Sequence, residues 1–344
     1  MARRSRSGSD PADDKGPAAS GPDDNTDMTA AFIGIDWGTT HRRATLVAAD
    51  GTLVAERADG EGALACKGRF AASLEALIAG WPEADASLPV VMAGMVGAAI
   101  GWQAVPYLDG GTPLSALARH LTPVAETPPG RRWFIAPGYR LHGDGGAVDV
   151  MRGEETQLFG ALHLLGPHAA DGCYVLPGTH SKWVRLHGGR ITELRTYMTG
   201  ELFALLRQHG TLASAMQTAG ANEEAGMKHD SVADDPEFLR GVADAAQGPV
   251  LTHALFGARA RVVTGALAPG AAAAYVSGLL IGAEWADAQR QASHDEPVRV
   301  IGEPALASLH AACAHHHGRR IESLDARQIQ LAAWRALAAE ELHA

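Results

Sequence analysis

The chain has 344 residues, of which 46% are hydrophobic and 20% are charged, and its formal net charge is −10. This length favours two domains with separate cores. The acidic balance argues against nucleic acid or an anionic membrane surface as the main partner. A phosphate ligand is not excluded, because it needs only a local site. The sequence holds no apolar run of about 18 residues, so we expect no membrane-spanning helix.

The cysteines Cys66, Cys173 and Cys313 are far apart and have no metal-ligand spacing. We therefore expect neither a disulfide framework nor a zinc site, and a cytoplasmic location, where thiols stay reduced. Residues 1–30 are rich in Ser, Gly, Pro and Asp and almost free of large apolar residues, which predicts disorder. The arginine pair in this extension lacks the apolar run of an export signal.

The first predicted strand ends at Asp36, and Gly38, Thr39 and Thr40 follow before the next strand begins at Arg43. Glycine permits a tight bend that brings backbone N–H groups close to an anion, and threonine hydroxyls add further donors. A carboxylate at the end of a strand can hold Mg²⁺ through water. The stretch therefore predicts a phosphate-binding turn with a magnesium-organising aspartate. The alternative interpretation is an ordinary β-hairpin turn.

Hydrophobic periodicity predicts the next elements of the chain. They are strands over 42–48 and 52–58, a helix over 68–80, a strand from 89 that breaks into the glycine-rich loop 94–97, a helix over 113–120 and a short strand over 133–135. Gly153 then precedes Glu154 and Glu155, and an apolar run at helical spacing follows. Carboxylates in the first turn of a helix are favoured by the helix dipole, which is a purely structural interpretation of both glutamates.

A second copy of the opening pattern begins near residue 173, and its turn contains Gly178, Thr179, Ser181 and Lys182. The predicted elements are strands over 174–176, 183–186 and 191–197, helices from about 200 to 292, a strand over 298–301 that ends at Gly302, a helix over 304–316, a strand over 320–324 and a helix over 326–342. Two facing Gly-Thr turns in a duplicated α/β unit suit a nucleotide held between two lobes. The motifs GxxxxGK[ST] and strand-GxGxxG of other nucleotide-binding folds are missing.

The layout resembles the superfamily of actin, sugar kinases and heat-shock chaperones, and within it the 2-dehydro-3-deoxygalactonokinase family. The resemblance runs from Phe32 to about Trp334. Its most specific segments are DWGTT at 36–40, VMAGMVGAAIGW at 91–102, MRGEETQLFGA at 151–161, PGTHSKWV at 177–184, MTGELF at 198–203 and SGLLIGAE at 277–284. It implies the fold class α/β, as a two-lobed ribonuclease H-like (actin/sugar kinase type) fold with an ATP cleft between duplicated α/β domains. We expect an N-terminal lobe over 31–150 and a C-terminal lobe over 151–344.

The family transfers a phosphoryl group from MgATP to the 6-hydroxyl of 2-dehydro-3-deoxy-D-galactonate, in galactonate breakdown. The resemblance therefore implies a kinase with ATP and Mg²⁺ as cofactors and a small sugar acid as substrate. The residues expected to hold MgATP are Asp36 for the metal, Gly38, Thr39 and Thr40 from the first lobe, Gly178, Thr179 and Ser181 from the second lobe, and Gly302 on the adenosine side. Lys182 would neutralise charge on the transferring group, unless it is a surface lysine at the start of a strand. Relatives usually carry a Gly-Ser turn where this chain has Gly302-Glu303-Pro304.

The resemblance also implies a catalytic base, since related sugar kinases place a carboxylate after a glycine, shortly before the second phosphate turn. Glu154 and Glu155 stand at that spacing, directly after Gly153. We predict that Glu154 takes the proton of the substrate hydroxyl, with Glu155 as the alternative. Only one of them can be the base, so at least one glutamate has the structural role.

A sugar acid needs backbone donors, hydroxyls and an arginine in its binding site. We predict that Gly94, Met95 and Gly97 form the wall of this site and that Trp102 forms an apolar side. The carboxylate would pair with one of two arginines, Arg43 or Arg152. Plain core packing is the alternative interpretation of Met95 and Trp102.

Two other functions stay open from the sequence alone. The first is a kinase of the same fold for another sugar acid or sugar. The second is a non-catalytic ATP-binding regulator or chaperone-like ATPase, although the carboxylates and turn residues of an active kinase are present. The alanine-rich helix predicted over 271–288 could pack within its lobe or against a second subunit, so a homodimer is not decided by the sequence.

Overall fold

The computed structural model describes residues 30–81, 87–143, 146–216, 232–289 and 296–342. The expectation of disorder before residue 31 therefore lies almost wholly outside the described residues. Within the described ranges, none of the helices combines the length and the apolar character needed to span a lipid bilayer.

The first sheet contains the Asp36 turn and has the strand order β3-β2-β1-β4-β7-β6. Its strands are β1 (Ala30–Trp37), β2 (Arg42–Ala48), β3 (Leu53–Asp59), β4 (Pro89–Gly94), β6 (Thr122–Pro123) and β7 (Arg132–Ile135). Strand β1 pairs antiparallel with β2 and parallel with β4. Apolar residues fill both faces of β1: Phe32 faces one core, whereas Ile33 and Ile35 face another that includes helix α1 (Phe70–Ala79). Strand β1 is therefore a central strand buried on both sides.

The second sheet repeats this arrangement, with the order β12-β11-β10-β13-β14. Its strands are β10 (Gly172–Leu176), β11 (Ser181–His187), β12 (Arg190–Tyr197), β13 (Val298–Gly302) and β14 (Ile321–Asp325). Strand β10 pairs antiparallel with β11 and parallel with β13, as β1 does with β2 and β4. The predicted duplication is confirmed, and in both sheets the Gly-Thr turn connects the first strand to the second.

A third, small sheet joins β5 (Leu108–Asp109), β8 (Tyr139–His142) and β9 (Val148–Met151). These strands are not predictable from the sequence, because two to four residues are too few to show a hydrophobic period. Only Arg152 and Gly153 separate the end of β9 from Glu154, the first residue of helix α2 (Glu154–Leu165). This sheet also contributes to the core, because Tyr139 of β8 and Met151 of β9 are buried in it.

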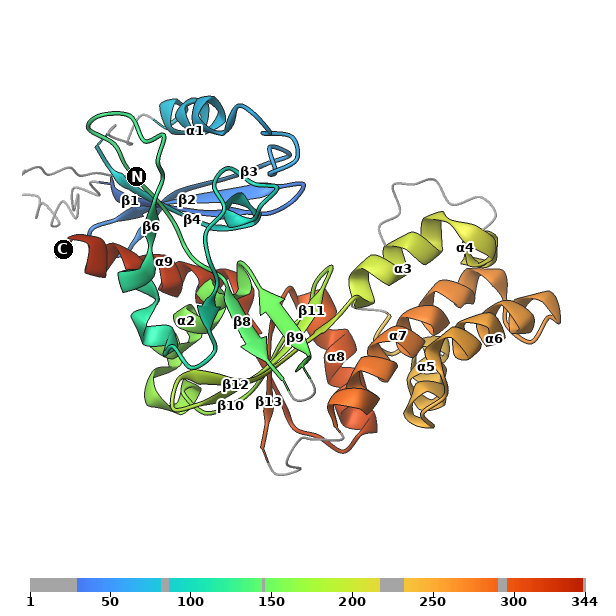
Figure 1. Cartoon of the computed structure of the whole chain (residues 1–344). Coiled ribbons are helices and arrows are strands. Elements are labelled where there is room, and N and C mark those ends of the chain that lie inside the picture. Colours follow the sequence, from blue (N-terminus) through green and yellow to red (C-terminus); the bar gives the residue numbers. More distant parts are fainter. Residues whose placement is uncertain (1–29, 82–86, 144–145, 217–231, 290–295, 343–344) are drawn as a thin grey trace, which may run out of the picture.

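Two helices lie between the large sheets, α2 (Glu154–Leu165) and α9 (Ala326–Leu342) (Figure 1). Leu158, Tyr174 and Trp334 belong to one core that both sheets and both helices share. Gly34 of β1 is required here, because a Cβ atom on it would lie 2.2 Å from the indole of Trp334. Helix α9 thus follows the second sheet in sequence but covers the first one.

The remaining helices lie mainly on one side of the second sheet (Figure 1). They are α3 (Thr199–Gln208), α4 (Gly210–Met216), α5 (Pro236–Ala246), α6 (Leu251–Val263), α7 (Ala272–Ala288) and α8 (Pro304–His316). Elsewhere in the described residues, short 3₁₀ helices cover Met95–Gly97, Leu114–His120, Gly166–Ala169 and Pro269–Ala271. Helices α5 and α7 pack backbone to backbone, since a Cβ on Gly278 would lie 2.1 Å from the carbonyl oxygen of Phe238. The alanine-rich helix therefore packs within its own lobe, and a homodimer stays a prediction.

Candidate active site

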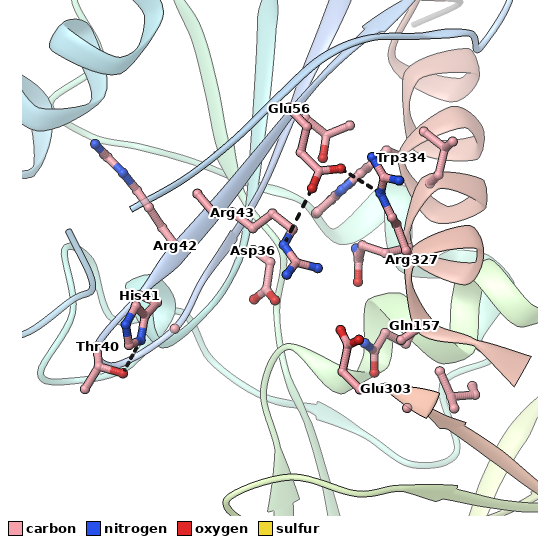
Figure 2. A pocket seen from close by; sticks show the side chains of 18 of the residues that line it. Asp36, Thr40, His41, Arg42, Arg43, Glu56, Gln157, Glu303, Arg327 and Trp334 are labelled. Atoms are coloured by element: carbon pink, nitrogen blue, oxygen red, sulfur yellow. Dashed lines mark hydrogen bonds and ion pairs between the residues drawn. The ribbon is translucent and has the colours of Figure 1, made fainter. Parts of the chain in front are cut away.

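A cleft of about 760 Å³ lies between the two large sheets (Figure 2). Of the predicted site residues, those that line it are Asp36, Gly38, Thr39, Thr40, Arg43, Thr179 and Gly302. Residues from both Gly-Thr turns thus share one cavity, although they are far apart in the sequence. Helix α9 adds Arg327, which the sequence analysis did not single out.

The first turn, residues 38–41, is held in shape by the loop that follows β3. The backbone N–H of Ala63 donates to the carbonyl oxygen of Gly38 at 2.9 Å, and that of Leu64 donates to Thr39 at 3.1 Å. Gly62 makes this approach possible, because a Cβ on it would lie 2.3 Å from the carbonyl carbon of Thr40. The hydroxyls of both threonines remain at the exposed edge of the cleft.

Asp36 is the penultimate residue of β1, and its carboxylate points into the cleft beside Arg43 (Figure 2). Asp36 is solvent-exposed in the cleft. Loss of hydration next to the cleft walls raises the pKa of Asp36, and the Arg43 charge opposes this shift. Arg43 in turn lies 3.8 Å from Glu56, which also pairs with Arg327 at 3.0 Å. Arg43 and Arg327 therefore share Glu56 as a counterion in the cleft, next to the Asp36 carboxylate.

The second turn, residues 177–180, is packed between the end of β13 and the start of α3. A Cβ on Gly302 would lie 2.9 Å from Cγ of Pro177, and one on Gly200 would lie 2.4 Å from the carbonyl oxygen of Gly178. The backbone N–H of Glu201 donates to the carbonyl oxygen of Thr179 at 2.9 Å. Gly178 itself lines a smaller, adjoining pocket rather than the main cleft.

Ser181 and Lys182 were predicted to bind phosphate, but the structure brings neither side chain into the cleft. Both begin strand β11 and are buried. The Ser181 hydroxyl donates to Glu284 at 2.6 Å, and the Lys182 ammonium donates to the carbonyl oxygen of Val150 at 2.9 Å. Their polar groups are therefore bound within the protein.

Glu284 is a residue that sequence reasoning missed. It is 2% exposed, and it also accepts hydrogen bonds from the indole of Trp183 and the hydroxyl of Thr199, both at 2.6 Å. It thus ties β11 to the first residue of α3, on either side of the second turn. Glu284 is the first charged residue of α7 after a stretch of twelve uncharged, mostly apolar residues, and this pattern is the signal that could have found it.

Glu154 and Glu155 begin helix α2, after Gly153 with φ +114°. A Cβ on Gly153 would lie 3.4 Å from Cα of Gly94, and a Cβ on Gly94 would lie 3.4 Å from Oδ1 of Asp36. The start of α2, the end of β4 and Asp36 therefore meet at one point. Glycine at 153 and 94 is favoured by this close approach and by a positive φ at both positions.

The two glutamates have different surroundings. Glu154 is half-buried and accepts a hydrogen bond from the backbone N–H of Arg152 at 3.0 Å. Burial raises the pKa of Glu154, and the charge of Lys182 opposes this shift. Glu155 is fully buried, accepts one backbone hydrogen bond from Gly153 at 2.7 Å, and leaves Oε1 without a partner. Burial, followed by the nearby charge of Glu154, raises the pKa of Glu155 to about 8.

Arg152 lies next to the predicted substrate loop. A Cβ on Gly97 would lie 2.8 Å from its Nη1, and its guanidinium lies 4.2 Å from the ring centre of Tyr107. Its Nη2 donates to the carbonyl oxygen of Val105 at 2.7 Å, whereas its Nε and Nη1 are buried without a partner. Among the two arginines considered for a substrate carboxylate, Arg152 is thus the one without a carboxylate partner in the described structure.

Trp102 and Met95 pack against the core next to α1. The ring of Trp102 stacks on Phe70 with centroids 5.8 Å apart, and its Nε1 donates to Glu126 at 3.1 Å. Met95 packs against the same core. Neither residue lines the main cleft, which agrees with the core-packing alternative for both.

The donor set of the cleft suits a magnesium nucleotide. Mg²⁺ is commonly bound through one or two carboxylates together with water and substrate phosphates, and Asp36 provides one solvent-exposed carboxylate in the cleft. Across the described residues, no cluster of three or more His, Cys, Asp or Glu side chains forms a closed metal cage.

Two sheets of the same strand order, each with a Gly-Thr turn facing a shared cleft, define a two-lobed kinase of the actin and sugar-kinase class. A family model described as 2-keto-3-deoxy-galactonokinase matches residues 36–337. This range covers most of the chain, so the protein belongs to the 2-keto-3-deoxy-galactonokinase family.

Individual relatives agree with this assignment. The chain is 35% identical to the 2-dehydro-3-deoxygalactonokinase of Escherichia coli (strain K12) over 282 residues, which covers 82% of this chain and 88% of the relative. It is 34% identical over 303 residues to a Rhizobium meliloti protein named for the same activity, with coverage of 87% and 94%. The crystal structure of a Sinorhizobium meliloti protein described as a 2-dehydro-3-deoxygalactonokinase superimposes with a TM-score of 0.79 at 32% identity, over 90% of this chain and 96% of that one.

Proposed function

We propose that this protein transfers the γ-phosphoryl group of ATP to the 6-hydroxyl of 2-dehydro-3-deoxy-D-galactonate. The family match over residues 36–337 carries the proposal. The shared cleft supports it, because residues of both Gly-Thr turns line one cavity beside Asp36. Use of ATP is consistent with a cytoplasmic location, which we propose together with the activity.

The chain's own groups suit the binding of a magnesium nucleotide. Backbone N–H groups and hydroxyls at residues 38–40 and at Thr179 would bind the phosphates from opposite sides, and Asp36 would hold Mg²⁺ directly or through water. Because Gly302 has no side chain, the adenosine could lie close to the backbone there. When bound, MgATP supplies the phosphoryl group and neutralises part of its charge.

Glu154 is the residue that we assign as the general base. It stands at the junction of α2, β4 and the Asp36 carboxylate and is half-buried, although it is not among the residues that line the main cleft. Glu155 is fully buried, which suits a structural role. Arg152 would pair with the substrate carboxylate, because two of its guanidinium nitrogens, Nε and Nη1, have no hydrogen-bond partner. These N–H groups are covered in the described structure, so the 94–97 loop must shift to admit the acid.

The test is ADP release by the purified protein with MgATP and one of three acceptors. We expect strong turnover with 2-dehydro-3-deoxy-D-galactonate, less with its gluconate epimer and none with an uncharged sugar. The variant Arg152→Met should raise KM for the acid about tenfold or more, while Arg43→Met, which removes the other candidate, should not raise it. Turnover that does not depend on any acceptor would reject the kinase assignment. Equal rates for both epimers would widen the substrate class.

A further inference from the structure

Lys182 is the buried lysine of the described structure, with 6% of its surface exposed. A buried ammonium group needs hydrogen-bond acceptors to compensate for lost hydration. Its Nζ donates to the carbonyl oxygen of Val150 at 2.9 Å and to the hydroxyl oxygen of Thr196 at 2.9 Å. Lys182 on β11 and Thr196 on β12 are cross-strand partners, so the ammonium joins the second sheet to strand β9 of the third sheet.

Asp149 makes a second connection at the same place. Its carboxylate accepts the hydroxyl of Thr196 at 2.5 Å and the backbone N–H of Thr196 at 2.7 Å. Thr196 is therefore bonded to both Lys182 and Asp149. We call the hydrogen bonds among Lys182, Thr196, Asp149 and the Val150 carbonyl the β9 link.

The β9 link lies close in sequence to Glu154, the proposed base, and to the second turn, which would bind phosphate. Strand β9 ends at Met151, and Arg152 and Gly153 lead directly to Glu154. On the other side, Lys182 is paired in register with Leu176, the last residue before the second turn. The positive charge of Lys182 also acts on Glu154, where it lowers the pKa against the effect of burial.

We propose that Lys182 is a positioning residue for phosphoryl transfer, which fastens the end of β9 to β11 and β12 and so fixes Glu154 relative to the second phosphate turn. This inference rests on the proposed function, because it assigns Glu154 a place in that reaction. It differs from a direct phosphate contact, since both Lys182 hydrogen bonds go to protein atoms. Misplacement of a catalytic group by about 1 Å can cost about 10²-fold in rate.

The test compares Lys182→Met, Thr196→Val and the double variant, with Lys67→Met as the control, because Lys67 is an exposed lysine. We expect each single variant to lower kcat about 10- to 100-fold while KM for ATP stays within about twofold. The double variant should be no slower than the slower single variant, because both changes break the same link. The control should keep the wild-type kcat.

Hydrogen exchange of the 148–153 amides gives a readout that does not depend on the substrate. Exchange there should be faster in both single variants, while exchange at the second turn should stay unchanged. Wild-type exchange in both variants would overturn the proposal, as would loss of ATP affinity in Lys182→Met alone, which would indicate a phosphate contact. If Lys182→Met does not fold, Thr196→Val decides by the same criteria. An inactive wild-type protein would reject the proposed function, and exchange would still test the link.

Discussion

Glu154 and Glu155 are neighbours in the chain, yet the environment of each carboxylate is different. Glu154 has a backbone N–H donor and the charge of Lys182 nearby, whereas Glu155 is enclosed with one oxygen unpartnered. Such a separation of two carboxylates by environment is typical of sites where one residue reacts and the other supports. The sequence could place both glutamates at the start of α2, but burial of one of them depends on distant segments.

The two isosteric variants should separate the roles. Glu154→Gln should lower kcat about 10²-fold or more, because the amide cannot take up the proton of the substrate hydroxyl, and it should leave the thermal stability close to wild type. Glu155→Gln should retain most of the activity. Steady-state rates and thermal unfolding of both variants check this. Wild-type turnover in Glu154→Gln would exclude it as the base.

Glu155 should also make the stability depend on pH. Its pKa in the folded protein, about 8, lies above the ordinary value of a glutamate, so the folded state favours the protonated form. This contribution to stability is fully present below the unfolded-state pKa and is lost as the pH rises through about 8. Glu155→Gln mimics the neutral form, so its melting temperature relative to wild type should rise between pH 6 and pH 9. A pH-independent difference would contradict the assigned burial.

Local sequence was sufficient for the residues of the first turn but not for all residues of the second. Asp36, Gly38, Thr39 and Thr40 line the cleft, and their contacts with MgATP stay a prediction. Ser181 and Lys182 are adjacent to the second turn, but they are already part of a strand, and their partners lie in α7, β9 and β12. Partners that are 103 residues apart, such as Ser181 and Glu284, leave no local pattern in the sequence.

At the level of elements, the strand-turn-strand units were predictable because each strand is apolar and ends at glycine or a polar turn. Strands β8 and β9 have four residues each and show no such pattern. The helix predicted over 113–120 is a 3₁₀ helix over Leu114–His120, and hydrophobic periodicity does not indicate this helix type. The contact between Gly302 and Pro177 joins two elements that the sequence shows only separately.

That contact gives a prediction for ATP binding. The added Cβ of Gly302→Ala would lie 2.9 Å from Cγ of Pro177, and the rigid proline ring can only move with the second turn. We expect KM for ATP to rise about tenfold, while KM for the sugar acid changes little. Gly257→Ala is the matched control, because nothing lies within 4 Å of its added Cβ. An unchanged KM for ATP in Gly302→Ala would show that the turn tolerates displacement.

For the molecule as a whole, the duplicated pattern predicted two sheets and a cleft, and the sheet orders confirm it. The proposed lobe boundary at residue 150 stays a prediction, but the shared core shows why a linear boundary is difficult to define. Helix α9 belongs to the second half of the chain and packs on β1 of the first half. The packing of a C-terminal helix on an N-terminal strand depends on tertiary contacts, and hydrophobic periodicity in the sequence does not show it.

The packing of α9 on β1 can be tested through Gly34. In Gly34→Ala the new methyl group would lie 2.2 Å from the indole of Trp334, so we expect a loss of about 1–3 kcal/mol in the free energy of unfolding. In the double variant Gly34→Ala/Trp334→Leu, the smaller leucine side chain should restore part of the lost free energy of unfolding. Gly60→Ala, where nothing lies within 4 Å of the added Cβ, serves as the control. Urea denaturation measures all three, and equal midpoints would refute the close packing.

The Gly34–Trp334 contact also has a consequence for synthesis on the ribosome. The two residues are about 300 positions apart, so β1 emerges long before the helix that covers it. During most of translation the apolar face of β1 has no native cover, and contacts of such long sequence separation form slowly. Nascent chains that stop before α9 should therefore bind chaperones or aggregate, although most of both sheets is already made.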